Sequence, residues 1–166
     1  MKDWKEDKRW SDRFLDEIKG ILGRHLIGEA TEEEDAKHNT DLIVLHMEAV
    51  RIACRVRRSE YHARFGGEFT IRADRPSGVD SELSKVIAGW GQYIFYAFAN
   101  EAETALDAWI LGNLNVFRLW VMRHMAGHNG RMPGTHCKNG DSSSSFFSFR
   151  VDAIPSTFLV ARKSLH

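Results

Sequence analysis

Arginines at alternate positions of strand-like segments are the residues of this chain best suited to binding phosphate. Arg55 and Arg57 lie two residues apart in the apolar run 50–57. They share one face of the expected strand, because successive side chains of a strand point to opposite faces. A guanidinium group stays charged and binds phosphate through two parallel hydrogen bonds. With Arg72 from a later run, the spacing favours a phosphate cradle; the alternative is a structural network in which Glu68 neutralises one arginine.

Charge is distributed unevenly along the chain. In total, 23 Lys and Arg balance 23 Asp and Glu. Residues 51–75, however, contain seven arginines and three acids, whereas residues 28–41 contain six acids and one lysine. This uneven distribution of charge indicates that the basic segment could bind phosphates, whereas the acidic segment would repel them or hold a cation.

Length and composition indicate one globular domain. A chain of 166 residues is long enough for one packed core and too short for two ordinary domains, so we expect a single domain over 1–166. No window has the apolar length of a membrane span, and the charged start MKDWKEDKRW lacks the apolar segment of a secretory signal. We therefore expect a cytoplasmic protein without a membrane partner. Cys54 and Cys137 do not make a disulfide framework.

Hydrophobic periodicity predicts the elements that would position these side chains. Apolar residues at helical spacing predict a helix from Ser11, as its N-cap, to Ile27, and another that starts at Ser81 and includes Phe98. A third helix is predicted over 115–125, followed by a loop over 126–145. The predicted strands are 41–47, 50–57, 68–73, 105–114 and 145–161.

The order of these elements predicts an α/β fold. It gives an αβββαβ core, in which a mixed sheet is flanked by helices. The first three strands are expected to form an antiparallel meander, and the fourth is expected to join through a helical crossover.

This order resembles the core of the restriction-endonuclease-like, or PD-(D/E)XK, nuclease superfamily, in a small and divergent phage-type form. In that family, an acid on the first helix, an acid on an early strand and an acid-x-lysine pair on the next strand bind magnesium and activate water. Glu17 resembles the helix acid and Asp41 the strand acid. Arg55 and Arg57 stand at the acid-x-lysine positions, and an arginine cannot bind magnesium.

Some branches of the superfamily place the second acid or the lysine on the following helix. Glu82 and Lys85 lie three residues apart there, and Gln92 and Tyr96 resemble the Gln-x-x-x-Tyr element of the exonuclease-like branch. The alternative for Glu82 and Lys85 is an exposed ion pair of little energetic weight.

The resemblance thus implies a relocated active site. Its metal, Mg²⁺ or Mn²⁺, would be held by Asp41, Glu82 and Glu17, with Asp41, Glu82 and Lys85 as the catalytic residues. Contacts with nucleic acid would come from Arg55, Arg57, Arg72, Gln92 and Tyr96.

Other side-chain combinations are less specific. The residue types of a zinc site are present in His124, His128, His136 and Cys137, but no CxxC or HExxH pattern accompanies them, which favours a loop that touches ligand or solvent. No Ser/His/Asp arrangement stands out in the sequence.

The leading hypothesis is therefore a metal-dependent phosphodiester hydrolase that acts on DNA or RNA. A second hypothesis is a catalytically inactive binding module that keeps the nuclease fold and binds nucleic acid. A third is a phage-type inhibitor of a host protein, motivated by the acidic run from Glu32 to Asp35. The partners compatible with these hypotheses are DNA or RNA, a host protein, and a second copy of the chain as a homodimer.

Overall fold

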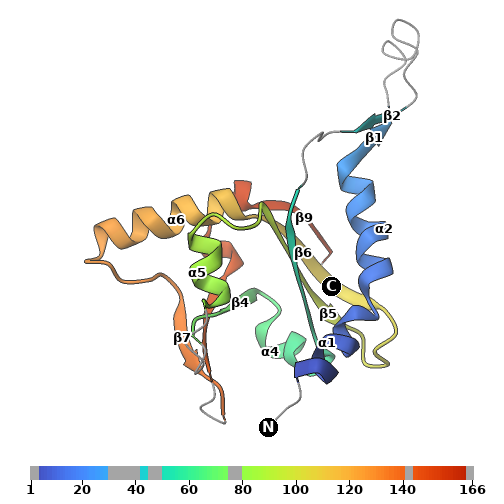
Figure 1. The fold of residues 1–166 in the computed structure, drawn as a ribbon, viewed down its shortest axis with the longest axis horizontal. Helices are drawn as coiled ribbons and strands as arrows, with labels where there is room; N and C mark the ends of the chain where they lie inside the picture. The colour runs from blue at the N-terminus through green and yellow to red at the C-terminus, as the bar shows by residue number, and fades with distance from the viewer. Residues whose placement is uncertain (1–3, 30–41, 45–49, 75–79, 141–143, 164–166) are drawn as a thin grey trace, which may run out of the picture. The chain divides into compact units, whose positions relative to one another are not determined.

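The described residues form helices and three β-sheets, of two, four and three strands (Figure 1). The computed structural model describes residues 4–29, 42–44, 50–74, 80–140 and 144–163. The chain divides into two compact units, residues 1–50 and 51–166. Among the described residues, no helix is both long enough and apolar enough to cross a membrane.

The first unit contains two helices and a short strand pair. Helix α1 spans Trp4–Asp12 and helix α2 spans Leu15–Leu26. Strand β1 (Ile27–Glu29) pairs antiparallel with β2 (Leu42–Val44).

The single helix predicted from Ser11 to Ile27 is wrong at its start. Ser11 belongs to α1, and its hydroxyl donates a hydrogen bond to the carbonyl of Lys8 at 2.9 Å instead of capping a new helix. The chain turns at Arg13 and Phe14 before α2 begins. The apolar face predicted for the rest of the helix is confirmed, since Ile18 and Ile21 are buried.

The second unit contains a mixed four-stranded sheet in the order β3-β5-β6-β9. Its strands are β3 (Ile52–Arg57), β5 (Tyr93–Ala99), β6 (Leu106–Asn113) and β9 (Leu159–Lys163). Strands β3 and β5 are parallel, whereas β5 with β6 and β6 with β9 are antiparallel.

A second, antiparallel sheet has the order β4-β8-β7. It contains β4 (Glu68–Arg72), β8 (Ser145–Arg150) and β7 (Thr135–Lys138). The α/β class with a mixed sheet is therefore confirmed, but the first three predicted strands do not form a meander. Strand β3 pairs with β5 in the first sheet, while β4 lies in the second.

Short helical segments connect and flank these strands. Between β3 and β5 lie the 3₁₀ turn η1 (Ser59–Tyr61), helix α4 (His62–Phe65), strand β4 and helix α5 (Glu82–Ile87). Helix α6 (Leu114–Gly127) follows β6 directly. Between β8 and β9 lie the 3₁₀ turns η2 (Val151–Ala153) and η3 (Ser156–Phe158).

The predicted helix from Ser81 to Phe98 is a helix only as far as Ile87. Ser81 does cap it, because its side chain accepts a hydrogen bond from the Ser84 N–H. Gly89 and Gly91 then adopt φ angles of 99° and 79°, which favour glycine and stop the helix. The chain continues as β5.

Two further boundaries differ from prediction. The predicted loop over 126–145 contains β7, and the predicted last strand over 145–161 is two strands, β8 and β9, in different sheets. Strand β6 and helix α6 lie where the sequence predicted them.

An aromatic core joins the two sheets and α6. Phe69 on β4 packs against Phe158 and Phe117 with ring centroids 5.4 Å and 5.6 Å apart, and Phe117 meets Phe149 at 4.9 Å. All four side chains are fully buried. Gly112 on β6 makes this packing possible, because a Cβ there would lie 2.3 Å from the Phe158 ring.

Candidate functional site

The residues predicted to form an active site are only partly brought together. Arg55 on β3 donates from Nη1 to Glu82 Oε2 on α5 at 3.2 Å. The same carboxylate oxygen accepts from the backbone N–H of Arg72 at 3.2 Å. Both side chains are about three-quarters shielded, with 24% of Arg55 and 31% of Glu82 exposed. The predicted phosphate-binding arginine thus neutralises a predicted metal ligand.

Other predicted contact residues make contacts within the protein. The Arg57 guanidinium carbon lies 4.4 Å from the centroid of the Tyr61 ring, a cation–π contact. The Tyr96 hydroxyl is 3.1 Å from Thr70 Oγ1 in a buried pair. Gln92 Oε1 accepts from the Arg51 N–H at 2.7 Å, which holds β5 beside the start of β3. These contacts position strands, and binding of nucleic acid by the same residues stays a prediction.

The described residues do not by themselves supply a metal site. Glu82 is engaged as above and Lys85 is exposed on α5. Glu17 belongs to the first unit, and Asp41 lies outside the described residues. In the described part of the chain, no three His, Cys, Asp or Glu side chains are grouped closely enough to hold an ion.

The histidines considered for zinc are engaged separately. His124 and His128 stack with centroids 4.0 Å apart, and His128 Nδ1 lies 2.8 Å from the His124 carbonyl oxygen. His136 on β7 instead lies with Nε2 2.8 Å from Ser145 Oγ on β8.

Ser145 connects His136 with an acid that the sequence did not associate with it. The Ser145 hydroxyl and N–H both donate to the carboxylate of Asp74, at 2.5 Å and 2.9 Å. These two bonds, the hydroxyl first, lower the pKa of Asp74. Ser145 is only 3% exposed, and Asp74 bonds the serine rather than the histidine, so the trio joins strand ends and is not a nucleophile site.

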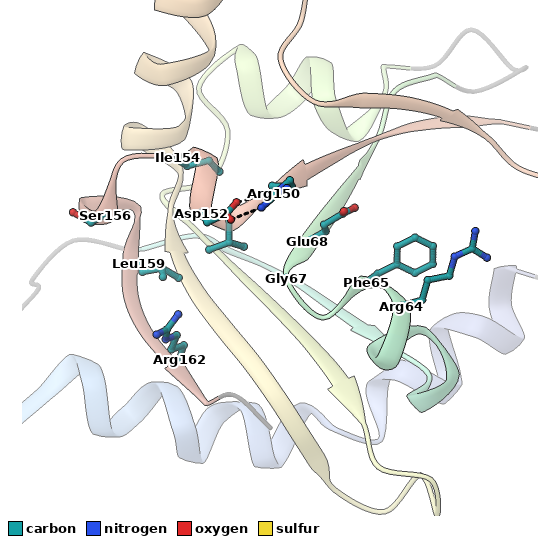
Figure 2. A pocket seen from close by; sticks show the side chains of 11 residues that line it. Arg64, Phe65, Gly67, Glu68, Arg150, Asp152, Ile154, Ser156, Leu159 and Arg162 are labelled. Carbon is teal, nitrogen blue, oxygen red and sulfur yellow. Dashed lines mark hydrogen bonds and ion pairs between the residues drawn. The ribbon is translucent and has the colours of Figure 1, made fainter. Parts of the chain in front are cut away.

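An open hollow of about 520 Å³ lies in the second unit and is large enough for a ligand. Its charged lining comes from separate elements: Arg64 on α4, Glu68 on β4, Arg150 on β8, Asp152 in η2 and Arg162 on β9. Figure 2 shows the Arg150–Asp152 ion pair in view between Arg162 on one side and Arg64 on the other. The size is within the range of about 300–1,000 Å³ that is common for ligand sites.

Apolar side chains complete the lining. Phe65, Ile154 and Leu159 face the hollow, and the Arg64 guanidinium carbon lies 5.2 Å from the centroid of the Phe65 ring. An anion bound there would therefore meet guanidinium groups beside surface of low polarity, where charge interactions are stronger than in water.

Two of the three arginines are available to an added anion. Arg150 is held by Asp152, whose hydrogen bond raises the pKa of Arg150 and is matched by a lowered pKa of Asp152. Glu68 accepts a short hydrogen bond from the Ser148 hydroxyl. Arg64 and Arg162 form no ion pair with the residues that the structure describes.

The charge of the two units differs in sign. Residues 51–166 contain fifteen Lys and Arg against ten Asp and Glu, a formal charge of +5. Residues 1–50 contain eight against thirteen, a formal charge of −5. The hollow thus lies in the cationic unit, whereas the neutral whole-chain balance conceals this difference.

Sequence reasoning missed this hollow because its arginines are far apart in the chain. Glu68 lies opposite Arg150 in the register of β4 with β8, and α4, which carries Arg64, comes shortly before β4 in the chain. No pattern of neighbouring residues in the sequence predicts the pairing of β4 with β8. Comparison of the chain with protein-family models, curated proteins and solved structures finds no match.

Proposed function

We propose that this chain is a nucleic-acid-binding module and that the arginine-lined hollow binds the phosphodiester backbone. The observation that carries the proposal is the convergence of Arg64, Arg150 and Arg162, from three different elements, on one open cavity of about 520 Å³. Arginine suits this task because its planar fork matches the oxygens of a phosphate.

Binding without cleavage is the better-supported form of this function. A carboxylate that takes part in metal catalysis needs its oxygens for the cation. Glu82 Oε2 instead accepts hydrogen bonds from Arg55 and from the N–H of Arg72. The hollow supplies donors for phosphate and requires no metal ion to bind one.

The test is a salt titration of binding to a labelled single-stranded oligonucleotide, followed by fluorescence anisotropy. Removal of one arginine that binds a phosphate should reduce the slope of log K against log salt by about 0.7. The double variant Arg64→Ala/Arg162→Ala should therefore reduce the slope by about 1.4 between about 50 and 200 mM salt.

The matched control is Arg123→Ala, which removes an exposed arginine of α6 that does not line the hollow. It should leave the slope unchanged. A slope near zero for the unaltered protein, or equal reductions in the double variant and in the control, would contradict the proposal.

A second candidate is the predicted magnesium-dependent nuclease. It is less well supported, because the Arg55–Glu82 ion pair engages one oxygen of a carboxylate that the relocated site assigns to the metal. Incubation of labelled DNA and RNA with Mg²⁺ or Mn²⁺, against a chelator control, tests it directly. Metal-dependent cleavage that disappears in Asp41→Ala and in Glu82→Ala would establish the nuclease, and cleavage that survives both changes would remove this site assignment.

The acidic run 32–35, which motivated the hypothesis of an inhibitor, lies outside the described residues.

A further inference from the structure

A smaller cavity adjoins the arginine-lined hollow. It has a volume of about 190 Å³ and shares Glu68 and Val151 with the hollow. Phe98 and Tyr96 of β5 and Ile110 of β6 contribute to its lining. We call this cavity the side chamber. Its volume is below the range of about 300–1,000 Å³ typical of whole ligand sites, so it suits one part of a larger ligand.

The lining of the side chamber combines aromatic rings with charged groups. The His62 ring meets the Phe98 ring edge to face, with centroids 4.8 Å apart. Lys163 also lines the chamber, where its ammonium group donates to the Leu106 carbonyl at 3.1 Å. A nucleobase combines an aromatic ring with polar edges, and bases held by single-strand-binding proteins typically stack on such side chains.

Glu68 lies at the boundary between the two cavities, because it lines both. Its Oε2 accepts from the Ser148 hydroxyl, and its Oε1 accepts no hydrogen bond from the described residues. A free carboxylate oxygen is a strong acceptor for a sugar hydroxyl. The ribose 2′-hydroxyl is the group by which a protein distinguishes RNA from DNA.

Arginines, a carboxylate and an aromatic chamber therefore follow one another in the same order as the phosphate, ribose and base of a nucleotide. We propose that the hollow and the side chamber together bind one unstacked nucleotide of single-stranded RNA, with the phosphates on its two sides at Arg64 and Arg162, its 2′-hydroxyl at Glu68 and its base in the side chamber. This inference rests on the proposed function, since it assigns the sugar type and the base position to the same site.

The experiment compares three labelled probes with the full chain: a short oligoadenylate of RNA, its DNA counterpart, and the same RNA backbone without bases. The RNA should bind about tenfold more tightly than the DNA, the size expected of one hydrogen bond to a charged group. The abasic RNA should bind more weakly than the complete RNA, because each stacked base adds favourable free energy.

Glu68→Ala should bring the RNA-to-DNA affinity ratio close to one. Ser148→Ala is the matched control, because it removes the same Glu68–Ser148 hydrogen bond and keeps the carboxylate. The control should retain the preference for RNA. The abasic comparison uses the unaltered protein, so it stays informative if a variant does not fold.

The outcomes separate this inference from the function on which it rests. If both RNA and DNA bind with a salt slope that depends on Arg64 and Arg162 but with equal affinities, the nucleic-acid module stands and the ribonucleotide site is overturned. Equal binding of abasic and complete RNA would likewise overturn it. If no probe binds, the proposed function itself fails.

Discussion

Arg55 and Glu82 form an ion pair of 3.2 Å between strand β3 and helix α5, on side chains that are 24% and 31% exposed. Arg55 Nη1 also lies 3.4 Å from the Thr70 carbonyl oxygen of β4. The guanidinium group therefore connects the edge of one sheet with the other sheet and with α5.

This pair should be measurable as a coupling. Ion pairs at exposed positions contribute about 0.2–1 kcal/mol, and partial shielding places this one near the upper end. A double-mutant cycle of Arg55→Ala and Glu82→Ala, followed by urea unfolding, should give a coupling of about 1 kcal/mol. The pair Lys19 and Asp16 on α2, with 74% and 97% of the side chains exposed, should give much less in the same cycle. Equal couplings for the two pairs would show that the Arg55–Glu82 contact does not stabilise the fold.

Gly112→Ala should destabilise the protein by overpacking. The added methyl carbon would lie 2.3 Å from the buried Phe158 ring, which is itself packed against Phe69. Such insertions typically cost about 1–3 kcal/mol. For a chain of this size, each kcal/mol lowers the melting temperature by about 2–4 °C. Gly127→Ala at the end of α6, where a Cβ meets nothing within 4 Å, should leave the melting temperature unchanged or raise it slightly. A melting temperature equal to that of the unaltered protein in Gly112→Ala would contradict the packing described here.

Replacement of Arg118 of α6 should destabilise the fold, even when the new residue is lysine. Its guanidinium donates to the Val86 carbonyl and the Gly91 carbonyl at 3.0 Å each, and to Asn115 Oδ1 at 2.7 Å. Burial lowers the pKa of Arg118, so these acceptors take the place of water. A lysine ammonium lacks the planar fork and cannot reach all three acceptors, and the expected decrease in stability is about 1–3 kcal/mol.

Urea unfolding midpoints report this decrease. Arg123→Lys, at an exposed position of the same helix, is the matched variant and should change the midpoint little. If Arg118→Lys and Arg123→Lys shift the midpoint equally, the decrease comes from the exchange of arginine for lysine in α6 and not from loss of the Arg118 hydrogen bonds.

The stability contributed by Asp74 should depend on pH. The Ser145 hydroxyl and N–H stabilise the carboxylate form and lower its pKa below the ordinary value of 3.8, with smaller contributions from His136 and Lys138. A folded pKa below the unfolded one means that the contribution is present above 3.8 and is lost as pH falls through the folded pKa.

Asp74→Asn should therefore melt at a lower temperature than the unaltered protein near neutral pH, and the gap should close as the pH falls below about 3.8. Melting curves across acidic and neutral pH check this. Asp80→Asn, at an exposed position, serves as the control. A gap of constant size over that range would mean that the Asp74 charge is not involved.

The elements that could be predicted from the sequence are those that bury one face and expose the other, because their apolar residues then recur at a regular spacing. Burial alternates over the first half of strand β6, and α6 begins after Asn113, whose side chain accepts hydrogen bonds from the N–H groups of Asn115 and Val116. Strand β5 was missed because all but its first residue are buried. A strand covered on both faces has no alternation, so its apolar run also fits a helix.

The candidate site was less accessible to prediction than the fold. The arginine pattern on β3 was visible, but the Arg55–Glu82 pair results from the crossover that brings α5 back toward β3. The hollow depends on the register of β4 with β8 and on the separate return of β9. Such long-range pairings have no short-range signature.

The opposite charges of the two units also affect how copies of the chain behave toward one another. A molecule with −5 on one unit and +5 on the other has no net repulsion to keep its copies apart. In dilute salt, the acidic unit of one copy attracts the basic unit of another, and self-association should increase. Added salt screens this attraction just as it weakens phosphate binding. Measurements of affinity in weak buffers therefore record a competition between nucleic acid and the protein's own acidic unit.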